Sequence, residues 1–291
     1  MKKFLKTILL ILILSPLFFF SCSLLQEETP VTATGKLSVH ITDAPFPANL
    51  VEHVYVTIER VSLRLKDGNC KTTEGEEIPD CDEGFLILLD EPVEIDLMQL
   101  RNGLSQLLAD TEVPVGVYDM LRLIVQDAEI IIDSEISFPL KVPGGSTGGL
   151  KVFLSNPIVV TEDGLSEILI DFDLSRSFVA QGNTKTKKGI HGFIFKPVIR
   201  AVDITKSGRI KGKVMDSANA PLENALVTLY QANEVITTAL TDIDGVFKII
   251  GVPSGTYSLT VEKEGFVSTE VKNIVVTKKQ EVVKNIKLVL K

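Results

Sequence analysis

Apolar and polar residues alternate along much of the chain, in short runs separated by turn-forming residues. Leu37, Val39 and Ile41 alternate with polar neighbours, and the run stops at Asp43-Ala44-Pro45. Strict alternation places the apolar side chains on one face of a strand. The pattern therefore predicts a strand that buries one face and ends before Pro45.

The segment 53–65 changes its alternation half-way. Apolar residues occupy positions 54, 56 and 58 and then positions 61, 63 and 65, so their parity changes at Glu59-Arg60. A shift of one residue in a strand moves every following side chain to the opposite face. We therefore predict a bulge or bend at Glu59-Arg60 that keeps both sets in the core.

One segment has helical spacing. Leu100, Leu104, Leu107 and Leu108 fall on one side of a helix over 98–109, although Gly103 weakens it. Elsewhere Val, Ile, Leu and Phe dominate, Trp is absent, and apolar residues make up 45% of the chain. This composition is typical of a globular protein built from strands.

Residues 208–291 contain seven short apolar runs separated by turn signals, at 209–215, 225–230, 235–241, 246–250, 257–261, 271–276 and 282–290. Asp242-Ile243-Asp244-Gly245 lies between the third and fourth runs and predicts a hairpin turn. This arrangement is typical of a small sandwich. We predict an all-β protein with two β-sandwich modules in series, at 35–204 and 208–291. The predicted core of the second is Val214, Val227, Leu229, Phe247, Ile249, Tyr257, Leu259 and Val261.

Both modules contain the sequence Val-Pro-x-Gly-x-Tyr, at 113–118 and at 252–257. Pro and Gly fit a type I turn, after which the Tyr enters a strand. We expect each Tyr hydroxyl to bond back to the preceding loop.

The first 22 residues have the composition of an export signal. Lys2, Lys3 and Lys6 precede an apolar run over 8–20, and Ser21-Cys22 follows it. The run is shorter than the roughly 20 residues that span a bilayer. It resembles the lipobox of bacterial lipoproteins, with Phe at position 19 where that motif usually has Leu. The resemblance implies removal of residues 1–21 and acylation of Cys22, for example with palmitate, as a membrane anchor.

Residues 22–34 are polar and show no apolar period, so we expect a flexible tether. Its acidic segment Gln26-Glu27-Glu28 is similar to a signal that sends some Gram-negative lipoproteins to the outer face. An ordinary solvated linker is the other interpretation. We expect an outer-membrane lipoprotein of the bacterial cell envelope, periplasmic or surface-exposed.

The charge is negative and uneven. The chain has 30 basic and 38 acidic residues, and removing the three lysines of the signal changes the net charge from −8 to −11. Residues 22–207 carry 29 acidic against 16 basic residues, whereas 208–291 carry 9 against 11. Nucleic-acid binding depends on basic residues that face phosphates, so this balance argues against nucleic acid as a partner.

Two cysteines remain if Cys22 is acylated, and these are Cys70 and Cys81. Exported proteins meet an oxidising environment, so we expect them to form a disulfide across an acidic, Gly-rich hairpin tip. A thiolate metal site is the alternative, but a second ligand pair at zinc spacing is missing.

The sequence contains no catalytic motif. His40, His53 and His191 are widely separated, and none belongs to a His-Glu-x-x-His or nucleophile motif. Asp242 and Asp244 are similar to the start of a calcium loop, but the later ligands are missing, and a turn is the competing interpretation. We expect no enzyme, no cofactor and no metal site. Asp242 and Asp244 are the weak candidates if calcium is bound.

Several motifs in 35–204 resemble those of one family: Gly35-Lys36-Leu37 with Thr42-Asp43-Ala44-Pro45, Pro114-Val115-Gly116-Val117-Tyr118 with Leu121-Arg122-Leu123, and Asp171-Phe172-Asp173-Leu174 with Lys196-Pro197-Val198. The family is domain of unknown function 4382, found in exported bacterial proteins. The resemblance implies a β-sandwich-like module and brings no known activity.

A second set of motifs lies in 208–291: Gly212-Lys213-Val214, Pro221-Leu222, Ala225-Leu226-Val227, Thr241-Asp242, Gly245-Val246-Phe247, Pro253-Ser254-Gly255-Thr256-Tyr257 and Glu264-Gly265-Phe266. This part resembles the carboxypeptidase regulatory-like domain. The resemblance implies a transthyretin-like sandwich, which is grouped with carbohydrate-binding-like folds, and it does not include the zinc-binding catalytic module.

These observations predict a lipid-anchored envelope protein with a non-catalytic binding, adhesion or structural role. The expected partners are the membrane, through the lipid, and envelope glycans or other surface proteins. One alternative is a carbohydrate-binding protein that acts through the C-terminal sandwich, although most of its few aromatic residues are expected in the core. The other is an envelope hydrolase that uses histidines and acidic residues of the first module.

Overall fold

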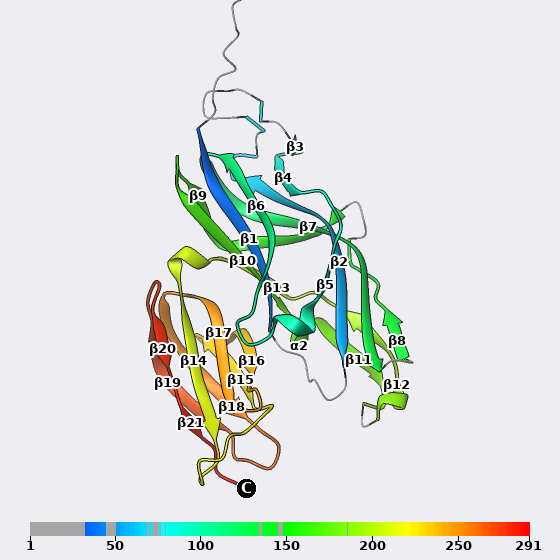
Figure 1. Cartoon of the computed structure of the whole chain (residues 1–291), viewed down its shortest axis with the longest axis vertical. Coiled ribbons are helices and arrows are strands. Elements are labelled where there is room, and N and C mark those ends of the chain that lie inside the picture. The colour runs from blue at the N-terminus through cyan, green and yellow to red at the C-terminus, as the bar shows by residue number, and fades with distance from the viewer. Residues whose placement is uncertain are drawn as a thin grey trace, which may run out of the picture. The chain divides into compact units, whose positions relative to one another are not determined.

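The computed structural model describes residues 33–44, 51–68, 70–71, 75, 77–78, 80–133, 136–144, 148–184 and 186–291. The predicted signal peptide, Cys22 and nearly all of the predicted tether lie outside the described residues. The described part belongs to one compact unit, and its regular secondary structure is almost all β-strand, which confirms the all-β prediction (Figure 1). None of its helices has the length and apolar character needed to cross a membrane.

The first module (residues 33–206) is built on an 11-stranded sheet. Its strands are β1 (Thr34–Ala44), β2 (His53–Leu65), β3 (Cys81–Asp82), β4 (Phe85–Leu89), β5 (Val93–Asp96), β6 (Gln106–Pro114), β7 (Gly116–Asp133), β8 (Ile136–Pro139), β9 (Leu150–Val160), β10 (Leu165–Asp173) and β13 (Ile199–Asp203). The order is β3-β4-β2-β7-β9-β13-β10-β1-β6, with β5 paired to β2 and β8 paired to β7.

Shorter elements complete this module. A separate hairpin consists of β11 (Phe178–Gly182) and β12 (Ile190–Phe195). The helical turns are η1 (Leu97–Leu100), α2 (Leu174–Ser177), η2 (Lys187–Gly189) and η3 (Ile204–Lys206). One hydrophobic cluster contains buried residues from β1, β2, β4, β6, β7, β9 and β10, so the large sheet curls around a common core.

The change of parity in 53–65 is a bulge, as predicted. The inward residues of β2 are buried on both sides of it, and the pairing with β7 shifts between Ile58 and Arg60. On the other strand, Thr57 pairs with Asp127 while Ile58 pairs with Val125. The apolar runs at 121–125 and 128–132 therefore belong to one continuous strand, β7, with an irregularity between them.

The predicted helix over 98–109 is wrong. Only the turn η1 forms, and the chain then reverses at Asn102 and Gly103, whose φ angles are +60° and +76°. Residues 106–114 continue as β6, which pairs antiparallel with β1. Leu107 is exposed whereas Leu108 is buried, so the leucines follow a strand and not one helical face.

The second module (residues 207–291) is a sandwich of two four-stranded sheets. One contains β14 (Ser207–Met215), β17 (Val246–Pro253), β20 (Glu281–Val283) and β21 (Ile286–Lys287); the other contains β15 (Leu226–Gln231), β16 (Glu234–Leu240), β18 (Gly255–Glu262) and β19 (Thr269–Val276). All eight predicted core residues belong to the hydrophobic cluster between these sheets. This cluster is distinct from that of the first module.

The shared Val-Pro-x-Gly-x-Tyr sequence has the predicted tertiary role in both modules. The Tyr118 hydroxyl donates to the Pro114 carbonyl at 2.8 Å, and the Tyr257 hydroxyl donates to the Pro253 carbonyl at 2.8 Å. Both rings are buried. Each Tyr thus fills its core with the ring while its hydroxyl closes the turn that precedes its strand.

Candidate functional site at the junction of the modules

Two motifs that are far apart in the sequence meet at the ends of parallel strands. β1 and β10 pair in register, with Thr42 beside Asp171 and Ala44 beside Asp173. Asp43, Asp171 and Asp173 are all buried, with exposed fractions of 3–5%. Because a buried carboxylate is costly unless it is paired, the carboxylates at these strand ends require partners from elsewhere in the chain.

Arg200 supplies the main partner and crosses to the second module. Its Nε lies 2.7 Å from Oδ2 of Asp171, on the neighbouring strand position. The same guanidinium donates to the carbonyls of Gly251 at 2.8 Å and Ile250 at 3.3 Å. The Thr237 hydroxyl, also from the second module, donates to Oδ2 of Asp171 at 2.9 Å. Asp171 and Arg200 therefore join the two modules through a buried, charge-assisted network.

A second arginine repeats this arrangement. Asp173 caps α2 by accepting the Arg176 N–H at 3.1 Å, and its other carboxylate oxygen lies 2.7 Å from Arg176 Nε. The Arg176 guanidinium reaches the carbonyls of Val235 at 3.2 Å and Ile236 at 3.4 Å. The second module is thus held at both of its sheets, through β17 and through β16.

Asn102 forms a third contact by pairing with the backbone of β17. Its amide nitrogen donates to the Val246 carbonyl at 3.2 Å, and its amide oxygen accepts the Lys248 N–H at 3.1 Å. The positive φ at Gly103 is needed here, and a Cβ at that position would lie 2.9 Å from Cδ of Lys248. The turn that replaces the predicted helix therefore serves the junction.

Asp43 is the buried carboxyl that the network leaves incompletely bonded. One oxygen accepts the Leu174 N–H at 3.4 Å, whereas Oδ2 has no hydrogen-bond partner. Burial raises the pKa of Asp43 well above its usual value, and the nearby Asp171 and Asp173 carboxylates raise it further. The raised pKa favours the neutral acid, which avoids a third negative charge at this strand edge.

A cleft of about 710 Å³ lies beside these contacts. Its first-module wall includes Ser105, Glu167 and Thr205, and its second-module wall includes Arg209 and Lys248. Lys278 and Lys279 line it from the turn between β19 and β20. The volume lies within the range of roughly 300–1,000 Å³ that small-molecule sites occupy. The junction therefore contains a preformed cleft with walls from both modules.

The turn that carries the two lysines is fixed to the neighbouring strand. The Lys279 N–H donates to the Ser207 carbonyl at 2.8 Å, and the Arg209 N–H donates to the Gln280 carbonyl at 2.9 Å. These bonds hold the backbone of the turn, while the Lys278 and Lys279 side chains extend into solvent at the cleft.

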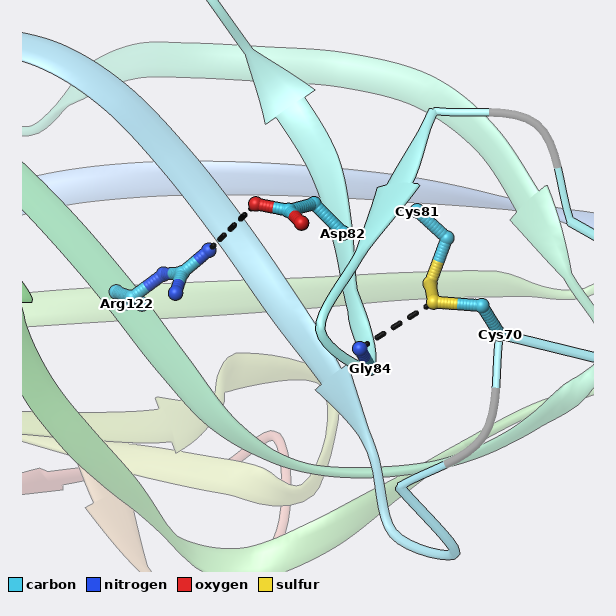
Figure 2. The surroundings of a disulfide bond; sticks show 5 residues. All are labelled: Cys70, Cys81, Asp82, Gly84 and Arg122. Carbon is cyan, nitrogen blue, oxygen red and sulfur yellow. Dashed lines mark hydrogen bonds and ion pairs between the residues drawn. A yellow bond between two sulfur atoms is a disulfide. The ribbon is translucent and has the colours of Figure 1, made fainter.

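The disulfide region lies on another part of the first module. Cys70 and Cys81 are joined by a disulfide, and the Gly84 N–H lies 3.3 Å from the Cys70 sulfur (Figure 2). Arg122 points from β7 toward Asp82, with its guanidinium 3.9 Å from that carboxylate and 4.2 Å above the centre of the Phe85 ring. The arginine thus packs beside the turn between β3 and β4, which directly follows Cys81.

The calcium candidates form a turn. Oδ1 of Asp242 accepts the N–H groups of Asp244 at 3.0 Å and Val246 at 2.8 Å, and Gly245 has a φ of +74°. The strands on either side, β16 and β17, belong to different sheets, so the predicted hairpin is wrong and the turn connects the two layers. No group of three metal-ligating side chains occurs among the residues that the structure describes.

The structure does not bring the three histidines together. Nδ1 of His53 lies 2.7 Å from Oδ2 of Asp96, a pair at the start of β2. His40 lies in β1 and His191 is exposed in β12. These side chains therefore do not form the catalytic arrangement that the hydrolase alternative requires.

Sequence reasoning did not identify Arg200, Asn102 or the basic cleft. One signal was available in the run Ile168 to Asp173, where two aspartates interrupt an otherwise apolar strand. A carboxylate within such a strand indicates a buried charge that needs a cationic partner. Nothing in the spacing of the chain indicated that the partner would also contact the second module.

Comparisons with known proteins support both resemblances. The family model described as Domain of unknown function (DUF4382) matches residues 34–197, and the model of the carboxypeptidase regulatory-like domain matches residues 209–289. No curated protein matches the sequence.

Similar solved structures have low TM-scores. A type II cohesin–X-dockerin complex from Acetivibrio cellulolyticus is 26% identical, with a TM-score of 0.23. The match covers 28% of this chain and 56% of the chain in that structure. A 3-chlorocatechol 1,2-dioxygenase from Rhodococcus opacus is 15% identical, with a TM-score of 0.24, and covers 30% and 61%. The TIE protein of Bacillus anthracis is 13% identical, with a TM-score of 0.25, and covers 88% and 34%.

This chain spans about half of the length of the first solved structures that it matches. The matched regions cover 56%, 40% and 56% of those three chains. The family match is the more informative result, because it covers more than half of the chain, including both aspartate motifs of the junction. The chain belongs to the DUF4382 family and carries a carboxypeptidase regulatory-like domain after that region.

Proposed function

We propose that this protein is a non-catalytic binding protein of the bacterial cell envelope, anchored by a lipid on Cys22, and that it binds an envelope glycan in the junction cleft. The observation that carries the proposal is the cleft itself, whose walls come from both modules. Partly buried contacts of Asp171, Arg200 and Asn102 hold the two walls in a defined geometry. A preformed site avoids part of the ordering cost of binding.

The lining suits recognition and offers little for catalysis. It supplies hydroxyl groups from Ser105 and Thr205 and charged groups from Arg209 and Lys248, all able to bond to sugar oxygens. None of the histidines lines it. The carboxypeptidase regulatory-like domain contributes most of the charged groups of the cleft, and its presence also supports a binding role.

The test is binding of the purified full chain to a glycan array, followed by titration of the retained glycans. Replacing exposed Ser105 with Trp fills part of the cleft, so Ser105→Trp should weaken binding strongly. The matched control is Thr256→Trp, an exposed position in β18 outside the cleft, which should leave binding unchanged.

Retention of no glycan by the wild-type chain would contradict the proposed function. Equal binding by the wild type and Ser105→Trp would show that any glycan binds elsewhere. Thermal unfolding of both variants should match that of the wild type, because both positions are exposed and neither takes part in a core.

A further inference from the structure

We propose that the junction cleft selects an anionic saccharide, one that carries carboxylate or phosphate groups on its sugar units. This inference rests on the proposed function and specifies its ligand class. It is carried by the charge of the cleft, which is opposite in sign to that of the chain. Arg209, Lys248, Lys278 and Lys279 line the cleft, and Glu167 is the one acidic residue of the lining.

The four cations are available to a ligand. Across the described part of the chain, none of the four forms an ion pair with a carboxylate, although 12 such pairs are found elsewhere. The closest candidate by strand register is Glu281, which pairs with Arg209 along the strands. Its carboxylate lies 2.5 Å from Lys211 Nζ, and that contact is the main cause that lowers the pKa of Glu281. Arg209 and Lys248 lower this pKa further through their charge, without forming an ion pair with Glu281.

The position of the cations also argues for a defined site. Arg209 and Lys248 project from strands of one sheet, and Lys278 and Lys279 come from a turn fixed to Ser207 and Arg209 by backbone bonds. Positive charges gathered in a cleft with low-dielectric walls attract an anion more strongly than the same charges spread over a surface. In a chain with a formal charge of −8, such a gathering is a local reversal of sign.

The rest of the lining favours a sugar over a simple ion. Hydroxyl groups of Ser105 and Thr205 can bond to sugar hydroxyls, and the apolar side chains of Leu165, Ile204 and Ile250 offer contact to the C–H face of a ring. No aromatic ring lines the cleft. Because stacking on an aromatic ring is therefore unavailable there, we expect the charged groups to supply the largest share of the affinity.

The experiment titrates the full chain with three probes: an oligogalacturonate, a neutral galacto-oligosaccharide of the same length, and inorganic phosphate. We expect the oligogalacturonate to bind at least about tenfold more tightly than the neutral oligosaccharide. Its affinity should fall as NaCl is raised from about 0.05 to 0.5 M, because salt screens the cleft charges. Inorganic phosphate should bind more weakly than the oligosaccharide.

A charge-matched pair of variants locates the effect. Arg209→Ala with Lys278→Ala removes two exposed cations of the cleft, whereas Lys213→Ala with Lys287→Ala removes two cations of the same module outside it. The first variant should lose about tenfold or more in oligogalacturonate affinity. The second should lose little, and the thermal unfolding of both should resemble that of the wild type.

Each contrary outcome has a distinct meaning. Equal binding of neutral and acidic oligosaccharides, both blocked by Ser105→Trp, would overturn the anionic selection while leaving the proposed function intact. Phosphate binding as tight as that of the oligogalacturonate would overturn the saccharide part. Equal losses in the two double variants would show that net charge, and not the cleft, attracts the ligand. Absence of binding to any glycan would contradict the proposed function itself.

Discussion

Arg200 and Asp171 lie opposite each other on β13 and β10, with 2.7 Å between Nε and the carboxylate, and both also contact the second module. Their side chains are only 17% and 4% exposed. A pair buried to this extent cannot lose one member cheaply, because the other is left charged without a partner. The relationship couples the stability of the first module to the position of the second.

We predict that Arg200→Met lowers the free energy of unfolding by about 3 kcal/mol. The control is Arg60→Met, which removes an exposed pair with Asp90 and should cost less than about 1 kcal/mol. Urea denaturation of the wild type and the two variants measures these changes in the free energy of unfolding. Adding Asp171→Asn to Arg200→Met should recover part of the loss, because no charge is then left buried. Equal losses for Arg200→Met and Arg60→Met would contradict the coupling.

Asp43 should make stability fall as pH rises. Its pKa is raised in the folded chain, so the folded state binds the proton more tightly than the unfolded state does. This contribution is present below the ordinary pKa of Asp, near 3.9, and is lost as pH rises toward the folded pKa. Asp43→Asn removes the titration, so its stability relative to the wild type should increase as pH rises above the ordinary pKa of Asp.

Asp110 provides the control of opposite sign. Hydrogen bonds from Lys36 and Ser38 lower the pKa of Asp110, so its contribution is present above the ordinary pKa and is lost as pH falls. Asp110→Asn should therefore lose stability relative to the wild type as pH rises through the acidic range. A pH-independent difference between Asp43→Asn and the wild type would show that Asp43 is not perturbed.

The second module should fold by itself. Its hydrophobic cluster is separate from that of the first module, so we predict that residues 208–291 unfold cooperatively as a soluble monomer. Circular dichroism would record the transition. Phe247 is fully buried, and Phe247→Ala should cost about 3 to 5 kcal/mol, which is enough to abolish the transition in so small a domain. Aggregation of the fragment unless residues 35–204 are present would contradict the boundary.

The disulfide between Cys70 and Cys81 should be present in protein isolated from the cell envelope. It closes a loop with a sequence separation of 11, for which the chain-entropy model gives about 3 kcal/mol of stabilisation. Thiol labelling after denaturation tests its presence, and Cys70→Ala with Cys81→Ala tests its contribution. Labelling of both native cysteines without prior reduction would be the contrary result.

Lipidation at Cys22 remains a prediction, since this residue lies outside the described part of the structure. Replacing Cys22 with Ala should abolish acyl labelling and move the protein from the membrane fraction to the soluble fraction. Cys70→Ala, which leaves the lipobox unchanged, is the control and should stay in the membrane fraction. Retention of Cys22→Ala in the membrane through an uncleaved signal would rule out the lipid as the anchor.

The sequence alone determined the class of the fold and much of its local detail. Period-two alternation identified strands such as β1 and β2, the change of parity in β2 located its bulge, and the repeated Val-Pro-x-Gly-x-Tyr sequence predicted the Tyr118 and Tyr257 hydroxyl bonds. These features depend on residues close together in the chain, where side-chain direction follows from backbone geometry. The failure at 98–109 has the same origin, because leucine spacing fits a helix until Asn102 and Gly103 reverse the chain.

Only the tertiary structure decided what lies at the junction. Asp43 and Asp171 meet because β1 and β10 pair in parallel, and Arg200 reaches Asp171 from the neighbouring strand β13 while it also contacts Gly251. The cleft likewise combines Glu167 with Lys248 and Lys279, which lie in three separate elements. Strand order and the packing of one module on the other depend on long-range contacts. These contacts cannot be inferred from the spacing of residues along the chain.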